Sequence, residues 1–126
     1  MLKKLLIDTD VIIDYLRDYT PAVQYLEKLS NPLQLSAITV AELYAGIRDK
    51  GEQKVIENFF GAFEIIPIDN VIAQTGGLLR KKYGKSHGTG LADALIAATA
   101  IHQESNLSTL NIRHYPMMKP IQPYVK

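Results

Sequence analysis

The chain has 126 residues, of which 47% are hydrophobic and 21% charged, a size and composition typical of one ordinary globular domain with a single core. Its 14 basic and 13 acidic residues leave a formal charge of +1, which excludes a nucleic-acid or membrane binder that acts through bulk charge. The absence of cysteine excludes a disulfide scaffold, a thiolate metal site and a thiol nucleophile. We therefore expect one domain over residues 1–126 that carries one functional site.

The start of the chain, MLKKLLI, imitates the basic region of a secretory signal peptide. Asp8 and Asp10 interrupt it before an apolar core of roughly 7 residues can form. No later stretch approaches the roughly 18 uncharged apolar residues of a membrane span. We therefore expect a cytoplasmic protein with no membrane partner.

The first half of the chain alternates short apolar runs with helical patterns. Val11, Ile12, Tyr15 and Leu16 recur at helical spacing, and Thr39 is positioned as a helix cap. These patterns predict strands over residues 4–7 and 33–38 and helices over residues 11–18, 21–30 and 39–50. The chain therefore begins as two strand–helix units, the first with an additional helix.

The second half continues this alternation. Asp69 is a candidate cap, and Gly84 marks the expected end of the helix that follows it. We predict helices near residues 54–63 and over 70–83 and 91–103, strands over 63–68 and 106–110, a loop over 84–90 and a proline-rich tail. This alternation favours a parallel sheet covered on both faces.

Polar residues follow three of the predicted strands. Asp8 follows the first, residues 39–42 follow the second, and residues 109–111 follow the last. Ligands of open parallel sheets gather outside the carboxyl ends of the strands. The three segments are therefore expected to reach one crevice.

Each acidic residue of these segments also has a purely structural explanation. Asp8, Thr9 or Asp10 could cap the first helix, and Asp93 could be an acid favoured by the dipole in the first turn of its helix. Glu42 stands three residues after Thr39, as in a capping box.

The surroundings of the acids favour a functional explanation. Asp93 and Thr99 are the only polar side chains in LADALIAATAI, so this helix is predicted to be buried. Neither Asp93 nor Glu42 has a basic partner three or four residues away on its own helix. Because buried carboxylates need compensation and repel one another, a bound divalent cation is expected, and carboxylate oxygens suit Mg²⁺ or Mn²⁺.

Four segments in order, LLIDTDVIIDYL, LSAITVAELYAGIR, GLADALIAATA and LSTLNIRHY, give the chain a resemblance to the PIN-domain family. The resemblance extends from Leu5 to about Tyr115 and is specific to VapC-like toxins of toxin–antitoxin pairs. It implies an α/β fold, a three-layer α/β/α sandwich with a short-stranded, mainly parallel central sheet. It also implies an endoribonuclease that cleaves single-stranded or structured RNA with a metal-activated water, acting as the toxin of a type II module.

Carried over position by position, the family's acids fall on Asp8, Glu42 and Asp93, which the resemblance makes both catalytic residues and ligands of Mg²⁺ or Mn²⁺. Asp10 matches a position near the first acid where the family commonly has Asp or Asn, so it ranks below the other three. Many relatives have a fourth acid after the last strand, where this chain has Asn111, a neutral ligand. The implied partners are an RNA substrate, a cognate VapB-like antitoxin and a second copy in a homodimer.

Basic residues that could contact the RNA backbone form two groups. One group lies on the helix predicted over residues 70–83 and the loop after it, and the other follows the last strand: Arg80, Lys81, Lys82 and Lys85, then Arg113 and His114. Thr9 and Thr109 are candidates for orienting the ligands.

Two alternatives stay open. IDTDVI also resembles the D-x-D turn of haloacid dehalogenase-like phosphatases, but Ile12 stands where that family expects Thr or Val, and its later motifs are absent. A PIN-like module could instead act mainly by binding protein or RNA. Metal-dependent cleavage of RNA separates these alternatives.

Overall fold

The computed structural model describes residues 2–126, which form a four-stranded, wholly parallel sheet. The strands are β1 (Leu5–Ile7), β2 (Leu33–Ser36), β3 (Glu64–Ile66) and β4 (Asn106–Ser108). They lie in the order β3-β2-β1-β4, so β1 is central and its end is flanked by the ends of β2 and β4. The predicted parallel sheet is confirmed, with strands of three or four residues.

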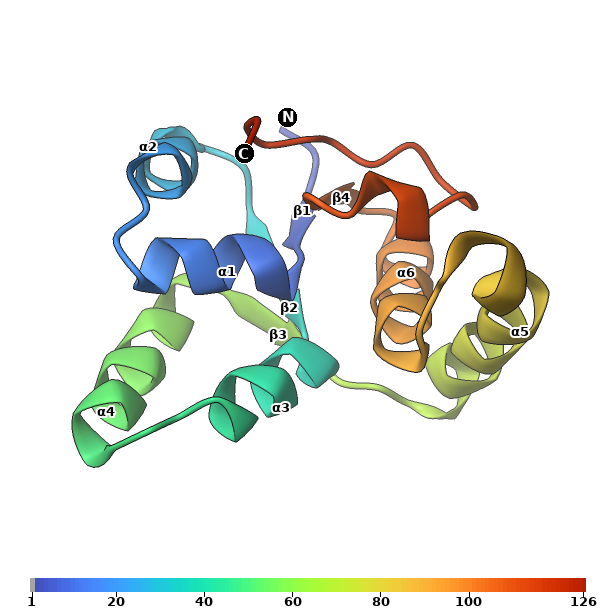
Figure 1. The fold of residues 1–126 in the computed structure, drawn as a ribbon, viewed down its shortest axis with the longest axis horizontal. Helices are drawn as coiled ribbons and strands as arrows, with labels where there is room; N and C mark the ends of the chain where they lie inside the picture. The colour runs from blue at the N-terminus through green and yellow to red at the C-terminus, as the bar shows by residue number, and fades with distance from the viewer. Residues whose placement is uncertain (1) are drawn as a thin grey trace.

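Helices cover both faces of the sheet. They are α1 (Thr9–Leu16), α2 (Thr20–Lys28), α3 (Ala37–Ala45), α4 (Lys50–Phe59), α5 (Asn70–His87) and α6 (Leu91–Gln103), with short 3-10 turns η1 (Phe60–Ala62) and η2 (Ile112–His114). In Figure 1, α1, α2 and α4 lie on one side of the strands, and α5 and α6 lie on the other. The three-layer α/β/α arrangement implied by the resemblance is confirmed.

Alternating side chains of β1 explain the two layers. Leu5 and Ile7 pack with Val11 of α1 and with residues of α2, α3 and α4. Leu6, between them, points to the opposite face and packs with Ile96 of α6. All three strand residues are at most 3% exposed, so both faces of the central strand are buried.

The boundary between β2 and α3 differs from the prediction. Ser36, not Thr39, is the N-cap of α3: its hydroxyl accepts a hydrogen bond from the backbone N–H of Ile38. Thr39 is fully buried in the first turn of the helix. The prediction of a Thr39 cap, and with it of a capping box with Glu42, is wrong because the strand ends two residues earlier than its apolar pattern suggests.

Two further boundaries are corrected. α3 ends at Ala45, and Asp49 caps α4 from Lys50 onward, so the helix predicted over residues 39–50 is shorter and the next one begins earlier. α5 continues through Gly84 and ends before Gly88, whose φ of 67° is left-handed, so the predicted loop is shorter. Gly84 inside α5 lowers the stability of the helix by only about 1 kcal/mol relative to alanine. The packing of α5 against α6 outweighs this loss.

Among residues 2–126, no helix combines the length and the apolar character that a bilayer crossing requires.

Candidate active site

Asp8 is the first residue after β1, and it caps α1. Its Oδ1 accepts from the backbone N–H of Thr9 at 2.7 Å, so the structural explanation of Asp8 as a cap is correct. The other oxygen, Oδ2, accepts from the hydroxyl of Thr109, after β4, also at 2.7 Å. With only 4% of its surface exposed, Asp8 is a buried carboxylate at the carboxyl edge of the sheet.

Asp93 lies beside Asp8, in the first turn of α6. Its Oδ2 accepts from the backbone N–H of Gly90 at 3.0 Å, as expected for an acid in a first turn. The hydroxyl of Tyr115 donates to Asp8 Oδ2 at 2.9 Å and lies 3.4 Å from Asp93 Oδ1. One hydroxyl therefore contacts carboxylate oxygens from the end of β1 and from the first turn of α6.

The environment of Asp93 differs from the prediction in two respects. Its side chain is 23% exposed, because Asp93 lies near the exposed end of α6, beside Leu91. The middle of the helix is buried all round over residues 96–100, as predicted. No basic partner lies on its own helix, as predicted, but His114 Nδ1 of η2 lies 3.2 Å from Asp93 Oδ2. His114, which was predicted to contact RNA, thus lies next to Asp93.

Glu42 reaches the site from α3 through Thr9. The Thr9 hydroxyl lies 2.6 Å from Glu42 Oε1 and 2.9 Å from the hydroxyl of Thr39. Thr9 is adjacent to Asp8 in the chain. This hydrogen bond therefore brings together the segments that follow β1 and β2, at the carboxyl ends of these two strands, as predicted. Glu42 itself is exposed on the surface.

Asp10 faces the segment after β4. Its Oδ2 accepts from the backbone N–H of Leu110 at 3.0 Å, and its Oδ1 accepts from that of Val11 at 2.8 Å. Burial, and then the charge of Asp8, raise the pKa of Asp10 to about 6, against the effect of these hydrogen bonds. Asp10 therefore adds a fourth carboxylate to those of Asp8, Asp93 and Glu42 at this edge of the sheet.

The site is electrostatically under-compensated. Burial raises the pKa of Asp8, and the charge of Asp93 raises it further, although hydrogen bonds from Thr109, Tyr115 and Thr9 oppose the shift. Burial and the charges of Asp8 and Asp93 also raise the pKa of the Tyr115 hydroxyl, so it remains a donor. In the part of the chain that the structure describes, Lys and Arg pair with acids only in Arg48–Glu52 and Lys126–Asp14, outside this site.

The donor chemistry of the site fits a hard divalent cation. Its oxygens come from the carboxylates of Asp8, Asp93 and Glu42, and no lysine or arginine competes for them in the described residues. Within residues 2–126, no three His, Asp or Glu side chains are already gathered around one point. Mg²⁺ retains several waters and binds through one or two carboxylates, so the Asp8–Asp93 pair satisfies its requirement.

The remaining predicted residues lie at the rim or on the outer surface. Asn111 precedes η2 and is exposed; its backbone N–H donates to the Thr109 hydroxyl at 3.0 Å. The basic residues of α5 and the basic residue before His114 are also exposed: Arg80, Lys81, Lys82, Lys85 and Arg113. A metal-binding role for Asn111 and an RNA-binding role for the basic residues stay predictions.

Tyr115 is the functional candidate that the sequence analysis missed. Its hydroxyl meets Asp8 across 107 positions of the chain. The only signal in the sequence is a tyrosine shortly after the last strand, and nothing local distinguishes it from a packing residue.

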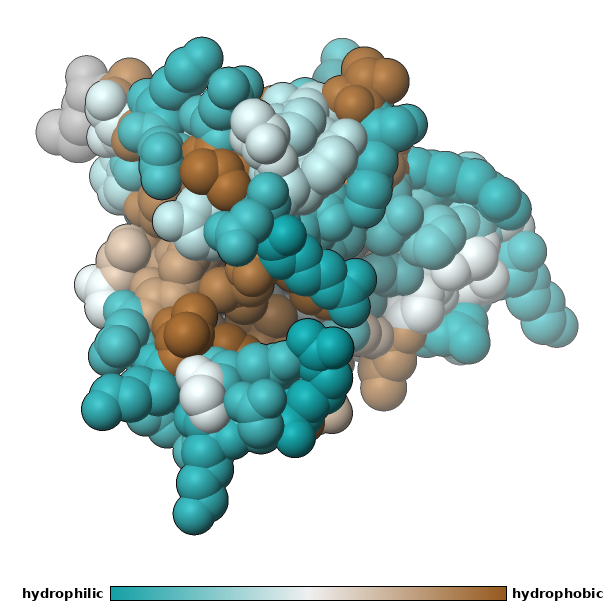
Figure 2. Space-filling model, turned by 60° about the vertical axis from the view of Figure 1, so that its left-hand side comes forward, coloured by the Kyte–Doolittle hydropathy of each residue, from teal (hydrophilic) through white to brown (hydrophobic). Residues whose placement is uncertain are grey.

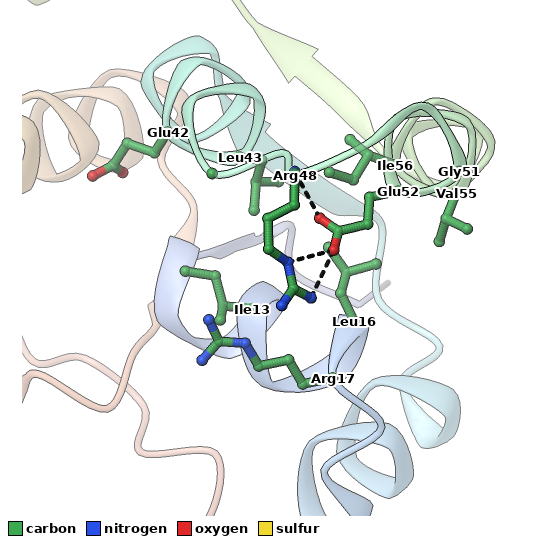
Figure 3. Close-up of a pocket in the computed structure, with 11 residues that line it drawn as sticks. Ile13, Leu16, Arg17, Glu42, Leu43, Arg48, Gly51, Glu52, Val55 and Ile56 are labelled. Atoms are coloured by element: carbon green, nitrogen blue, oxygen red, sulfur yellow. Dashed lines mark hydrogen bonds and ion pairs between the residues drawn. The ribbon is translucent and has the colours of Figure 1, made fainter.

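An apolar cavity of about 580 Å³ lies next to Glu42, between α1, α3 and α4. Its apolar lining comes from all three helices: Ile13, Leu16, Leu43, Val55 and Ile56. Figure 2 shows hydrophobic surface in a hollow between hydrophilic rims on this side of the molecule. In Figure 3, Arg48 and Glu52 pair at the cavity, while Glu42 points away from its apolar centre. The cavity and the acidic site are therefore neighbours that share Glu42.

Comparison with known proteins gives a family match over most of the chain. Residues 5–115 match the PIN domain. The chain is 39% identical over 122 residues to ribonuclease VapC19 and 37% identical over 122 residues to ribonuclease VapC10, both of Mycobacterium tuberculosis. The alignments cover 94% of this chain and 97% and 91% of those proteins.

The fold of a solved structure also matches that of this chain. A toxin–antitoxin complex from Klebsiella pneumoniae contains a chain that superposes with a TM-score of 0.83 at 28% identity, covering 95% of this chain and 98% of that one. The order of the strands, the acids at their carboxyl ends and these similarities together show that the chain belongs to the PIN-domain family, in its VapC branch.

Proposed function

We propose that the chain is a Mg²⁺- or Mn²⁺-dependent endoribonuclease and the toxin of a type II toxin–antitoxin pair. The observation that supports this most is the meeting of Asp8 and Asp93 at one hydroxyl, at the carboxyl edge of a parallel sheet, with no lysine or arginine paired to either in residues 2–126. The similarity to VapC ribonucleases supports RNA as the substrate class.

Each residue of the site has a role in the proposed mechanism that follows from its position. Asp8 and Asp93 would hold the cation, and Glu42, connected through Thr9, would extend the ligand set on the open side. A bound Mg²⁺ or Mn²⁺ supplies activation of a water and neutralisation of charge on the phosphate. Thr109 fixes the orientation of the Asp8 carboxylate through its 2.7 Å hydrogen bond. No separate side-chain base is required.

RNA cleavage by the purified chain tests this proposal. A fluorescent single-stranded RNA should be cut in Mg²⁺ or Mn²⁺ and not in EDTA. Asp8→Asn should lower the rate by more than about 100-fold, because losing a ligand exceeds the 10–100-fold typical of losing an outer partner. The fold should persist, since the hydroxyls of Thr109 and Tyr115 can accept from an amide.

Asp69→Asn is the matched control for that experiment. Asp69 caps α5 through the backbone N–H of Ile72, and asparagine caps equally well, so cleavage should be unchanged. Full activity of Asp8→Asn in Mg²⁺ would refute the proposed mechanism. RNA binding without cleavage by the wild type would favour the alternative in which the domain acts by binding.

We further propose that the partner is a small VapB-like antitoxin, one segment of which lies in the cavity between α1, α3 and α4. The similar chain from Klebsiella pneumoniae was solved within a toxin–antitoxin complex. The cavity offers an apolar surface, including Val55 at 56% exposure, and ends at Glu42, which a basic side chain of the partner could neutralise.

A pair of substitutions tests this docking site. Val55→Glu, within the cavity, should abolish co-purification of the antitoxin from the native operon and leave cleavage of RNA intact. Val71→Glu, on α5 and outside the cavity, changes a side chain of nearly equal exposure, 54%, and should have no effect. Equal recovery of the antitoxin with both variants would contradict the docking site.

We also propose the homodimer that the family resemblance implies. Light scattering of the purified chain measures its mass in solution and so tests this proposal.

A further inference from the structure

Tyr115 is held rigidly beneath the acidic site. It is 1% exposed and packs in the apolar cluster that contains Leu6, Ile96 and Leu107. Its backbone N–H donates to the carbonyl oxygen of Ile112 at 3.0 Å, at the end of η2. Because ring and backbone are both fixed, the position of the hydroxyl is determined by the core.

The hydroxyl lies between the two acids, which other groups also hold: Thr109 donates to Asp8 Oδ2, and His114 Nδ1 lies 3.2 Å from Asp93 Oδ2. Asp8 is anchored at Oδ1 by the backbone N–H of Thr9, and Asp93 is anchored at Oδ2 by that of Gly90. The second oxygen of each acid lies near the Tyr115 hydroxyl, at 2.9 Å and 3.4 Å. The single hydroxyl proton serves Asp8, the closer partner, and the contact with Asp93 is weaker.

We propose that Tyr115 is a positioning residue that fixes the separation of the Asp8 and Asp93 carboxylates and thereby sets the affinity of the site for a divalent cation. This inference rests on the proposed function, because it assigns the cation to these two acids. Two carboxylates can share one cation only if an oxygen of each points to a common position, and the hydroxyl makes the oxygens converge before the cation arrives. Because Tyr115 is 1% exposed, it is shielded from substrate and acts only through the acids.

Direct measurement of Mn²⁺ binding tests the inference without relying on activity. Free Mn²⁺ is counted by electron paramagnetic resonance in titrations of the wild type and of Tyr115→Phe, which keeps the buried ring and removes the hydroxyl. We expect the dissociation constant to rise by about 10-fold or more, the range found for outer partners of metal ligands. At saturating Mn²⁺ the rate of RNA cleavage should return to within a few-fold of the wild type.

Tyr25→Phe is the matched control. The Tyr25 hydroxyl also makes a hydrogen bond at the sheet, to the Ser108 hydroxyl at 2.9 Å, and none to the acids in the described residues. This variant should bind Mn²⁺ like the wild type. Thermal unfolding without metal establishes that both variants fold.

A second measurement needs no variant. The Tyr115 hydroxyl proton, shielded from solvent, should give a protected proton resonance that shifts on addition of Mg²⁺, while that of Tyr25 should not. An unchanged or lower Mn²⁺ dissociation constant for Tyr115→Phe, or a Tyr115 resonance insensitive to Mg²⁺, would overturn the positioning role and leave the nuclease proposal standing. A wild type that binds no Mn²⁺ would overturn both.

Discussion

Neutralising Asp10 should change how the stability of the metal-free chain depends on pH. The pKa of Asp10 is raised from 3.8 to about 6 in the folded chain, so the folded state binds more protons than the unfolded state between these values. The stabilising contribution of protonated Asp10 is therefore complete below about pH 4 and is lost as pH rises through about 6. At 1.36 kcal/mol per unit, the whole effect is about 3 kcal/mol.

Urea unfolding at pH 5.0 and pH 7.5 in EDTA measures the effect. From the linkage relation, Asp10 alone should make the wild type about 1.4 kcal/mol less stable at pH 7.5 than at pH 5.0, and Asp8, whose pKa is also raised, should add to the difference. Saturating Mg²⁺ should reverse the trend, because the cation binds the ionised acids.

Asp10→Asn should reduce the difference between the two pH values by about 1.4 kcal/mol. An amide has one oxygen, so the N–H of Val11 or Leu110 loses its acceptor, which costs about 1–3 kcal/mol at both pH values and cancels in the comparison. Asp69→Asn serves as the control with an unchanged pH dependence. Equal pH dependence in the wild type and Asp10→Asn would refute the argument that this carboxylate is under-compensated.

Three further predictions concern the metal. Asp93→Asn and Glu42→Gln should each lower the rate of RNA cleavage by more than about 100-fold, with the circular dichroism spectrum of the wild type. Full activity of either variant would exclude that acid from the site. Asn111→Asp should lower the Mg²⁺ concentration for half-maximal cleavage, because affinity rises with the number of charged ligands; an unchanged midpoint would place Asn111 outside the site. Mg²⁺ at 100 times its dissociation constant should stabilise the wild type by about 2.7 kcal/mol in calorimetry and stabilise Asp8→Asn far less; equal stabilisation would contradict binding at Asp8.

Local patterns in the sequence determined the fold class and the neighbourhood of the site. The helix predicted over residues 91–103 coincides with α6, because its apolar composition and flanking glycine are local signals. The position of Asp8 at the end of a strand followed in the same way from a short apolar run. Once the strands are parallel, their carboxyl ends share an edge, so the convergence of the acidic segments could be predicted.

The tertiary structure decided how the acids are held. The N-cap of α3 is Ser36 and not the predicted Thr39, because β2 ends at Ser36. The end of β2 depends on its pairing with β1 and β3, which are distant in the sequence. The meeting of Tyr115 with Asp8 and Asp93 depends on the placement of β4 beside β1 and on the packing of the tyrosine ring in the apolar cluster on the α6 face of the sheet. Hydrophobic periodicity records which side of an element is buried, but which distant side chain it is buried against is fixed only when the whole chain packs.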